Sequence, residues 1–414
     1  MTRTLAIDGS RLHARLTEIA RYGATAAGGL DRQALGPDEI AARGYVVGVA
    51  RERGFDCTAD AIGNLFVRRA GTRPELPPIL CGSHLDSQPK GGRFDGTLGV
   101  MAALEVLESL EDAWASHRHP IEAVAWTNEE GARFIPSTMG SQTYAGVVDL
   151  AAMLAVTDAA GVTVAEALAE ADAAYGPLPR RALGGPVAAY LELHIEQGPV
   201  LESLGLPLAV VDGIQGARWR RVVLDGRPGH AGTTPEALRQ DAGDAAIRAA
   251  VAARAAAMAD GDARVRFTIG RIAFGPGSIN TIPGTAQFTI DLRHPDDAAL
   301  DRIVARIAEA VATEAAPCRA RIETLMNVAA TRFDARVLAA CEDAVRAQGI
   351  AVHRMTSGAM HDAQFAALCG PAGMLFIPCR DGVSHAESEA IEPQHATVGA
   401  QALLDAVLYL DKAM

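Results

Sequence analysis

Three stretches decide the fold prediction: PPILCGSHLDS at 77–87, TLGVMAALEVLESL at 97–110 and IEAVAWTNEEG at 121–131. The first and third are apolar runs that end in polar clusters, a pattern typical of buried strands with ionisable residues at their carboxyl ends. The middle stretch has apolar residues at helical spacing, namely Leu98, Met101, Leu104 and Leu107. A strand, a helix and a strand in this order predict a mostly parallel sheet with helices on its faces. Ligands bind such sheets at the carboxyl ends of the strands.

The chain on either side of this core has its own pattern. A further apolar run, AAYLELHIEQG at 188–198, predicts another buried strand. Residues 213–328 instead predict a strand, a helix, two strands, a helix and a strand, which is the order of a ferredoxin-like unit. We therefore expect an α/β domain built from residues 1–212 and 329–414, with a smaller domain inserted at 213–328.

Composition excludes several classes of protein. The 414 residues carry a formal net charge of −12. A negative surface repels phosphate groups, so neither nucleic acid nor an anionic membrane is an expected partner. No membrane-spanning helix is predicted, because the sequence has no run of ~18 or more apolar residues, and its first residues lack the apolar core of a signal peptide. The six cysteines lie far apart without a CxxC pair, which suits the reducing cytosol, so a cytoplasmic location is expected.

Several chain segments deliver residues of metal-ligand type to the predicted strand ends. Imidazole suits zinc and related transition metals, and carboxylates can bridge two cations. The candidate ligands are His84, His194, His385, Asp95 and one glutamate of the pair Glu129 and Glu130. Five ligands are too many for one tetrahedral ion, but they fit two ions that share Asp95. Two such ions ~3.5–4 Å apart can activate a water molecule and polarise a carbonyl group together.

The two adjacent glutamates, Glu129 and Glu130, are predicted to have different roles. One carboxylate of Glu129 and Glu130 would bind a metal ion, and its neighbour would be free to take a proton from water and pass it to a leaving nitrogen. Asp86, two residues after His84, is expected to accept the second imidazole N–H and so orient the ring. Each residue alone has a simpler interpretation, such as a structural histidine, a solvated glutamate pair or a turn aspartate. The metal interpretation is favoured because several strand ends present such residues together.

Six strings of the sequence occur in the order found in one enzyme family: GSHLDSQPKGGRFDGTLGV, WTNEEGARF, ELHIEQGPVLE, GRPGHAGTTP, IPGTAQFTIDLR and SGAMHDAQ. On these strings the chain resembles the hydantoinase/carbamoylase amidases, which are dinuclear metal hydrolases related to zinc aminoacylases and carboxypeptidases. The resemblance spans about residues 45 to 395, and HIEQGPVLE and HAGTTP separate this branch from its peptidase relatives. It implies a catalytic α/β domain and a smaller domain that serves as lid and dimerisation surface.

The resemblance also implies the roles of the candidate ligands. Asp95 would bridge two divalent ions. Glu130 and His385 would hold one ion, and His84 and His194 would hold the other. Zinc is the expected metal, while manganese, cobalt and nickel also accept this ligand set.

Two residues are implied in catalysis by the same resemblance. Glu129 would be the general acid and base. His230, in GHAGTTP of the inserted domain, would help to stabilise the oxyanion, and a well-placed donor of this kind is worth roughly 3 kcal/mol. In relatives the matching histidine often reaches across a dimer, so a homodimer is expected.

Four further residues are implied as substrate contacts. Arg293 and Asn280 match positions that bind the substrate carboxylate, and a guanidinium group can pair with both carboxylate oxygens. Gln197 and His361 are also candidates, although a structural amide or a supporting histidine would look the same. Met360 stands where relatives usually carry glycine, and its side chain is expected to narrow the pocket or shift His361.

The motifs TNEEGARF, GIQGARW and CRDGVSHAE favour the N-carbamoyl-L-amino acid hydrolases within the branch. The predicted function is therefore metal-dependent hydrolysis of the ureido C–N bond of a small N-carbamoyl-L-amino acid, giving the amino acid, CO2 and ammonia. The alternatives are an allantoate amidohydrolase or a β-ureidopropionase acting on a related ureido acid, and, third, a peptidase. A catalytically silent binding protein would have lost a ligand or the base, whereas this sequence keeps all six positions.

Overall fold

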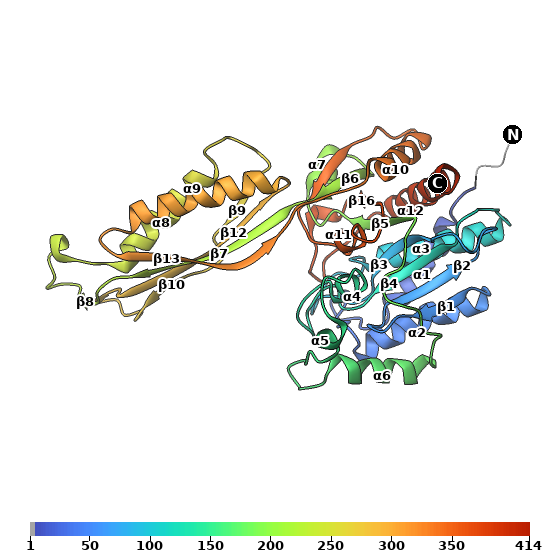
Figure 1. The fold of residues 1–414 in the computed structure, drawn as a ribbon, viewed down its shortest axis with the longest axis horizontal. Helices are drawn as coiled ribbons and strands as arrows, with labels where there is room; N and C mark the ends of the chain where they lie inside the picture. The colour runs from blue at the N-terminus through green and yellow to red at the C-terminus, as the bar shows by residue number, and fades with distance from the viewer. Residues whose placement is uncertain (1–4) are drawn as a thin grey trace. The chain divides into compact units, whose positions relative to one another are not determined.

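The computed structural model describes residues 5–414 of the chain, which fold into two compact units (Figure 1). Unit 1 contains the chain up to Asp212 and from Phe333 onward, and unit 2 contains Gly213–Arg332. The segment expected from the sequence begins at the same residue and ends at 328. Unit 1 is therefore assembled from two stretches of chain that are separated by the whole of unit 2.

Unit 1 is built around a sheet of nine strands in the described residues, in the order β1-β2-β4-β3-β5-β16-β6-β14, with β15 beside β6. Its central strands are parallel to one another: β4 (Ile121–Trp126), β3 (Ile79–His84), β5 (Ala189–Ile195) and β16 (Ala372–Ile377). The flanking strands are β1 (Asp56–Ala59), β2 (Leu65–Arg69), β6 (Ala209–Ile214), β14 (Thr331–Arg332) and β15 (Arg354–Ser357). The pairs that β1, β2, β6 and β14 make along this order are antiparallel. Unit 1 is thus a mixed α/β structure with a mostly parallel centre, and the three predicted apolar runs form β3, β4 and β5.

Every residue of β3, β4, β5 and β16 is buried, so both faces of the central sheet are covered. One group of helices packs together over the central strands: α1 (Gly9–Ile19), α3 (Thr97–Asp112), α10 (Ala335–Ala347) and α12 (Pro393–Ala413). Other helices contact the sheet at different strands: α2 (Pro37–Glu52), α4 (Met139–Tyr144) and α11 (Ala363–Ala366). Shorter elements complete the unit: α5 (Leu150–Leu154), α6 (Val164–Tyr175), α7 (Val200–Leu204) and the 3-10 turn η2 (Arg380–Gly382). None of the helices in the described chain is long and apolar enough to cross a membrane.

Helix α3 is the element that aligns the strand ends. It follows β3 and leads into β4, and its residues from Thr97 to Leu110 are buried. Because this crossover returns the chain to the starting edge of the sheet, β3 and β4 run in the same direction. The carboxyl ends of β3, β4, β5 and β16 therefore meet at one edge, where the polar clusters of the sequence follow them.

Unit 2 has a five-stranded antiparallel sheet in the order β10-β12-β7-β13, with β9 paired to β12. Its strands are β7 (Gly216–Asp225), β9 (Arg266–Thr268), β10 (Ile272–Gly275), β12 (Thr285–His294) and β13 (Arg319–Val328). Helices α8 (Ala242–Ala257) and α9 (Asp297–Ala315) share a core with alternate β12 residues, namely Phe288, Ile290 and Leu292. Two short strands, β8 (Gly229–His230) and β11 (Thr281–Ile282), form a separate ladder, and η1 (Glu236–Leu238) follows β8.

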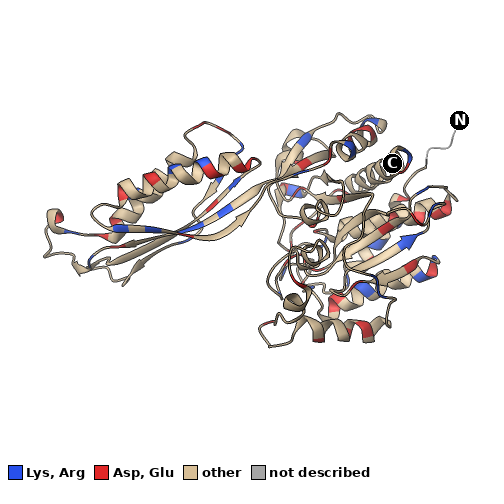
Figure 2. Cartoon of the chain, in the orientation of Figure 1, with Lys and Arg blue, Asp and Glu red and all other residues tan. Residues whose placement is uncertain are grey.

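Arginine residues, blue in Figure 2, lie within β7 and β13 of unit 2. Arg221 lies 3.0 Å from Glu323, and Arg321 lies 2.7 Å from Asp225. These arginines are therefore partly neutralised by acidic neighbours on the same sheet.

Candidate metal centre

The five predicted metal ligands meet at the carboxyl edge of the central sheet of unit 1. His84 is the last residue of β3, and His194 is the residue before the end of β5. Asp95 lies two residues before α3, Glu130 follows β4, and His385 lies in the loop after β16. Parallel strands end at a common edge, so ligands that are far apart in the sequence become neighbours in space.

Asp95 lies at the centre of this cluster. Its Oδ1 atom is 3.2 Å from Nε2 of His194 and 3.7 Å from Nε2 of His84. Its Oδ2 atom is 3.3 Å from Nε2 of His385, and that nitrogen is 3.6 Å from Oε2 of Glu130. The ligand atoms form two groups, His84 with Asp95 and His194, and Asp95 with Glu130 and His385, each with all its ligand atoms within 4.8 Å of one another. Asp95 belongs to both groups, as a bridging ligand must.

Hydrogen bonds orient two of the imidazole rings. Nδ1 of His84 is 2.9 Å from the carbonyl oxygen of Asp86, and Nδ1 of His194 is 2.9 Å from the carbonyl oxygen of Ile195. A carbonyl oxygen only accepts, so Nδ1 is assigned a proton in both rings, and Nε2 is the nitrogen that remains for a metal ion. The N–H group of Gly96 donates to Nε2 of His194 at 3.2 Å, which agrees with this tautomer. Both Nε2 atoms face the centre of the cluster.

In residues 5–414 the basic neighbours of the cluster's carboxylates are histidines. The side chains of Asp95, Glu129 and Glu130 are 3%, 11% and 6% exposed, and none pairs with a lysine or arginine in residues 5–414. Burial raises the pKa of Glu130 to about 8, and the nearby charge of Asp95 adds to the effect. Burial also raises the pKa of Glu129 well above its ordinary value, together with repulsion from Asp362. Bound cations would compensate these charges, so the residues fit the metal ions that the resemblance implies.

The histidines of the cluster differ in their acid–base behaviour. Burial lowers the pKa of His84 to about 4, so its ring is neutral at neutral pH, which is the form that binds a metal ion. The hydrogen bond to Asp95 raises the pKa of His385 to about 9, although burial opposes the shift. The side chain of His385 is 49% exposed, so it forms the solvent-facing side of the cluster.

The two adjacent glutamates occupy different environments. The Glu130 carboxylate accepts the backbone N–H of Gln88 at 3.1 Å and the Gln88 side-chain amide at 2.9 Å, and it faces His385. The Glu129 carboxylate accepts no hydrogen bond from the described residues, and its Oε2 atom is 3.7 Å from Nε2 of His84. An unbound carboxylate with a raised pKa beside the cluster has the properties of a general base.

The predicted role of Asp86 requires a correction. Its carboxylate lies 3.8 Å from Nδ1 of His84, which is too long for a hydrogen bond, and its backbone carbonyl accepts from the ring instead. The carboxylate accepts the backbone N–H groups of Glu129 at 3.2 Å and Glu130 at 3.1 Å. The expectation that the Asp86 side chain binds the imidazole is therefore wrong, because two amides of the next strand end already occupy it.

Three supporting residues were not singled out in the sequence. Gln88 holds Glu130 as described, and Ser384 donates to Oδ2 of Asp95 at 2.9 Å. Glu389 is 3% exposed and accepts hydrogen bonds at the Asp95 loop. Gln88 follows the polar end of the first apolar run, which is a weak signal in the sequence. For Ser384 and Glu389 no signal exists beyond their position near His385.

Gln197 and His361 both lie beside the cluster. The side-chain amide of Gln197 donates to Oδ2 of Asp95 at 2.8 Å, and its Oε1 atom is buried without a hydrogen bond in the described structure. The ring of His361 packs on the ring of His194, with centroids 4.6 Å apart, and its Nε2 lies 3.0 Å from the Ser357 hydroxyl. Both side chains therefore contact ligand residues, and their proposed role toward substrate stays a prediction.

The remaining predicted residues belong to unit 2. His230 lies in β8, where it is paired with Thr281, and the carbonyl of Asn280 accepts the N–H of the residue after His230 at 3.0 Å. Arg293 lies near the end of β12, opposite Ala217 of β7, and donates to Asp291 at 2.9 Å. Unit 2 thus brings His230 and Asn280 together and holds Arg293 at the other end of its sheet.

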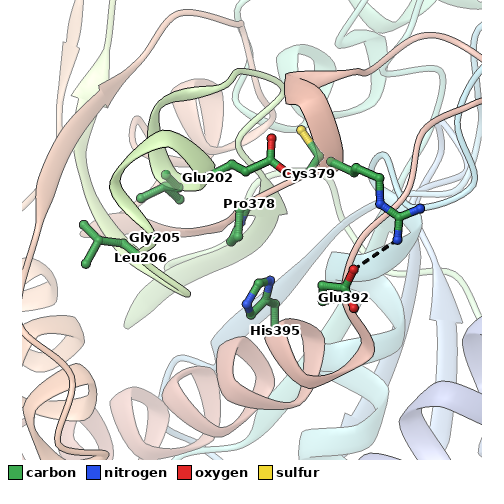
Figure 3. A pocket seen from close by; sticks show the side chains of 9 residues that line it. Glu202, Gly205, Leu206, Pro378, Cys379, Glu392 and His395 are labelled. Atoms are coloured by element: carbon green, nitrogen blue, oxygen red, sulfur yellow. Dashed lines mark hydrogen bonds and ion pairs between the residues drawn. The ribbon is translucent and has the colours of Figure 1, made fainter.

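A separate cavity of about 160 Å³ lies elsewhere in unit 1 (Figure 3). Its lining includes Leu201, Cys379 and His395, together with an ion pair of 3.0 Å between Arg380 and Glu392. None of the five predicted ligands lines this cavity. The chemistry predicted from the sequence therefore belongs to the Asp95 cluster and not to this hollow.

Comparison with known proteins defines the class of this chain. The model of the Peptidase family M20/M25/M40 matches residues 80–409, which is most of the chain, and the chain belongs to this family. It is also similar over 99% of its length to the crystal structure of a hydantoinase/carbamoylase family amidase from Burkholderia multivorans. That pair has a TM-score of 0.93 and 40% sequence identity over 99% of the other chain.

Curated relatives narrow the class to one branch. The chain is 39% identical to an N-carbamoyl-L-amino acid amidohydrolase of Geobacillus stearothermophilus, over 98% of this chain and 99% of the relative. It is 37% identical to the corresponding enzyme of Rhizobium meliloti, over 97% and 96%. An allantoate amidohydrolase of Bacillus subtilis is 33% identical over 94% of both chains. The predicted resemblance to the hydantoinase/carbamoylase amidases is confirmed, and the chain is a hydrolase of carbon–nitrogen bonds.

Proposed function

We propose that this protein hydrolyses the ureido C–N bond of an N-carbamoyl-L-amino acid. The products would be the L-amino acid, CO2 and ammonia. The observation that carries the proposal is the convergence of four metal-type ligands on Asp95, with the buried carboxylate of Glu129 left free beside them. The identity of 37–39% with two N-carbamoyl-L-amino acid amidohydrolases over nearly the whole chain supports the choice of substrate.

Two divalent cations would be held at the cluster. His84 and His194 would bind one ion, Glu130 and His385 would bind the other, and Asp95 would bind both. When bound, such a pair supplies Lewis acidity that favours ionisation of a water molecule and polarises the ureido carbonyl. Zinc is the proposed ion, with manganese, cobalt and nickel as alternatives that the same donors accept.

The proton transfers would fall to Glu129. Its carboxylate takes a proton from the attacking water as the new C–O bond forms at the ureido carbon, and it returns that proton to the amino nitrogen as the C–N bond breaks. The carbamate that is released then decomposes to CO2 and ammonia. Burial, together with repulsion from Asp362, raises the pKa of Glu129 well above its ordinary value, and a raised pKa makes a carboxylate a stronger base.

The polar residues of unit 2 would bind the rest of the substrate. His230 would donate a hydrogen bond to the oxyanion that develops at the ureido carbonyl. Arg293 and Asn280 would bind the carboxylate, and Gln197 and His361 are further proposed contacts. Unit 2 would act as the lid whose closure excludes water from the site.

The spacing of these residues within unit 2 supports a shared site in a homodimer. Arg293 lies eight positions after Thr285 in β12, which is a distance of about 26 Å in an extended strand. Asn280 and His230 lie beyond Thr285, at the β8–β11 ladder (Figure 1). A single ureido acid is far shorter than this distance. One copy of unit 2 therefore cannot place both groups on one substrate, and we propose that a partner copy supplies His230 and Asn280.

Allantoate is the second candidate substrate, because the Bacillus subtilis relative of that name covers 94% of the chain at 33% identity. Like a carbamoyl amino acid, it combines a ureido group with a carboxylate, so the same donors would serve. β-Ureidopropionate has the same combination. We also propose a cytoplasmic location, because all six cysteines are free.

An assay of ammonia release would test the proposal. The metal-loaded protein would be offered N-carbamoyl-L-amino acids with different side chains, their D-enantiomers, allantoate and β-ureidopropionate. We expect the highest kcat/KM for an N-carbamoyl-L-amino acid and little turnover of its D-enantiomer. A higher kcat/KM for allantoate would show that allantoate, and not an N-carbamoyl-L-amino acid, is the preferred substrate. Failure to hydrolyse any carbamoyl compound with metal present would refute the proposal.

A further inference from the structure

Glu389 connects two loops that each deliver a ligand to the Asp95 cluster. Its Oε1 atom accepts the backbone N–H of Phe94 at 2.9 Å and the backbone N–H of Asp95 at 3.2 Å. Its Oε2 atom lies 3.1 Å from the hydroxyl oxygen of Ser384, whose single proton is shared between Glu389 and Asp95. Ser384 precedes His385 in the chain and lies 2.9 Å from Oδ2 of Asp95. The backbone and the side chain of Asp95 are thus both tied to the same buried carboxylate, one directly and the other through Ser384.

This arrangement controls the direction of a bridging ligand. Oδ1 of Asp95 faces His84 and His194, while Oδ2 faces His385. If the Asp95 carboxylate rotated, at least one of its oxygens would no longer face its histidine neighbours. Hydrogen bonds to an ionised acceptor are stronger than neutral ones. Supporting residues of this type commonly change metal affinity by about 10- to 100-fold when they are replaced.

The close approach of the backbone to Glu389 depends on Gly92. A Cβ atom at position 92 would lie 1.9 Å from Cδ of Glu389 and 2.1 Å from both carboxylate oxygens. A side chain at position 92 would therefore have to displace the Glu389 carboxylate from its place beside the Asp95 loop. The contact therefore depends on two residues, the buried carboxylate of Glu389 and the glycine at position 92.

We propose that Glu389 is a positioning residue that orients the Asp95 carboxylate and couples the Asp95 loop to the His385 loop. This inference rests on the proposed metal centre, but not on the identity of the substrate. Glu389 contacts neither the other proposed ligands nor the general base in the described structure, so it acts through Asp95 and Ser384.

The test compares variants of the full-length, metal-free protein by titration with Mn²⁺. Glu389→Gln keeps the shape of the side chain but has only one acceptor oxygen, so it cannot accept both the two backbone N–H groups and the Ser384 hydroxyl. Glu387→Gln is the matched control, because it removes the same charge two residues away, where the carboxylate accepts no hydrogen bond from the described residues. Electron paramagnetic resonance would count free Mn²⁺ and report the magnetic coupling between two bridged ions. Circular dichroism would monitor the fold.

We expect Glu389→Gln to lose about 10- to 100-fold in affinity for at least one Mn²⁺ ion and to weaken the coupled signal, while it stays folded. Gly92→Ala should cause a loss of the same kind, because it displaces Glu389 from the opposite side. Where Glu389→Gln does not fold, Gly92→Ala decides the question. Equal Mn²⁺ affinity and coupling in Glu389→Gln and Glu387→Gln would overturn the proposal, because a purely structural role would lower only the thermal stability.

The outcomes separate this inference from the proposed function. A wild-type protein that binds no Mn²⁺ or Zn²⁺ would remove the metal centre itself, and Glu389 would have no bridging ligand to orient. A wild-type protein that binds two ions but hydrolyses no ureido acid would refute only the substrate. In that case the affinities of the variants still decide the role of Glu389.

Discussion

The carboxylate of Asp86 accepts the backbone N–H group of Glu130 at 3.1 Å. It also accepts the N–H group of Glu129 at 3.2 Å, so one buried side chain holds both glutamates at the end of β4. Glu389 makes the same kind of contact with the N–H groups of Phe94 and Asp95. In both cases a buried carboxylate accepts hydrogen bonds from two successive backbone N–H groups, in a loop that carries a candidate ligand. The cluster is therefore held in place by backbone hydrogen bonds as well as by the strands that precede it.

Replacement of Asp86 should disturb both glutamates at once. In Asp86→Asn, only one side-chain oxygen remains, and the new amide N–H group faces a backbone N–H group. We expect metal affinity and kcat to fall by roughly 10- to 100-fold, with little change in KM. Titration with Zn²⁺ and steady-state kinetics would measure the three quantities. Unchanged metal affinity would show that the strand ends alone place Glu130.

The predicted role of Glu129 in proton transfer should be experimentally separable from metal binding. Glu129→Gln removes the base but leaves Asp95, Glu130 and the histidines intact. We expect the variant to bind metal as the wild type does, while kcat falls by about 10²- to 10⁴-fold. Metal analysis of the purified variant and single-turnover kinetics would check both parts. Substantial residual activity would mean that the acid and base roles belong to the other glutamate.

Metal binding should release protons at neutral pH. In the metal-free protein the hydrogen bond to Asp95 raises the pKa of His385 to about 9, so the ring is protonated at pH 7 and must lose its proton to bind an ion. Glu130, whose pKa burial raises to about 8, must also lose its proton to bind the same ion. Affinity for this ion should therefore weaken as the pH falls below about 9, by up to roughly tenfold per unit for each proton released. Calorimetry in buffers of different ionisation enthalpy would count the protons. We expect release at pH 7 that disappears above pH 9, and binding without proton release at pH 7 would contradict this assignment.

The proposed sharing of sites predicts complementation between two inactive variants. Glu129→Gln lacks the base in unit 1, and His230→Ala lacks the oxyanion donor in unit 2. If His230 serves the partner's site, a hybrid dimer contains one site with both groups intact. A mixture that exchanges subunits should then recover about a quarter of the wild-type activity, because half of the dimers are hybrids with one active site each. A mixture that stays inactive after proven exchange would place His230 in the site of its own chain.

Gly96 should be intolerant of a side chain for two separate reasons. Its φ is +61°, and an added Cβ atom would lie 2.3 Å from ring atoms of His84. The left-handed backbone alone should cost Gly96→Ala about 1–2 kcal/mol, and displacement of the ring should weaken metal binding. Gly146→Ala is the matched control, since Gly146 has a φ of +71° but nothing within 4 Å of the added atom. Thermal denaturation should find both variants destabilised, and metal titration should find a loss of affinity only in Gly96→Ala.

Much of the architecture follows from local patterns in the sequence. The apolar runs that became β3, β4 and β5, and the helical spacing of α3, predict the parallel centre of unit 1 without any knowledge of distant contacts. The convergence of the candidate ligands follows from the same pattern, because the polar residues stand at strand ends that share one edge. Periodicity does not show which of Glu129 and Glu130 is the metal ligand and which is the general base. That assignment depended on a resemblance, and the hydrogen bonds from Gln88 now distinguish the two environments.

The sequence by itself determined which residues could reach the carboxyl edge of the sheet, because strand and helix periods depend on neighbours a few positions away. Only the tertiary structure decided which atom of Asp86 contacts His84 and that Glu389 accepts hydrogen bonds from the Asp95 loop. It also decided that Arg293 lies in the five-stranded sheet of unit 2, while Asn280 lies beside the separate β8–β11 ladder. Phe94 and Glu389 are 295 positions apart in the chain. Their hydrogen bond of 2.9 Å exists because tertiary packing brings the two loops together, and no local sequence pattern specifies that contact.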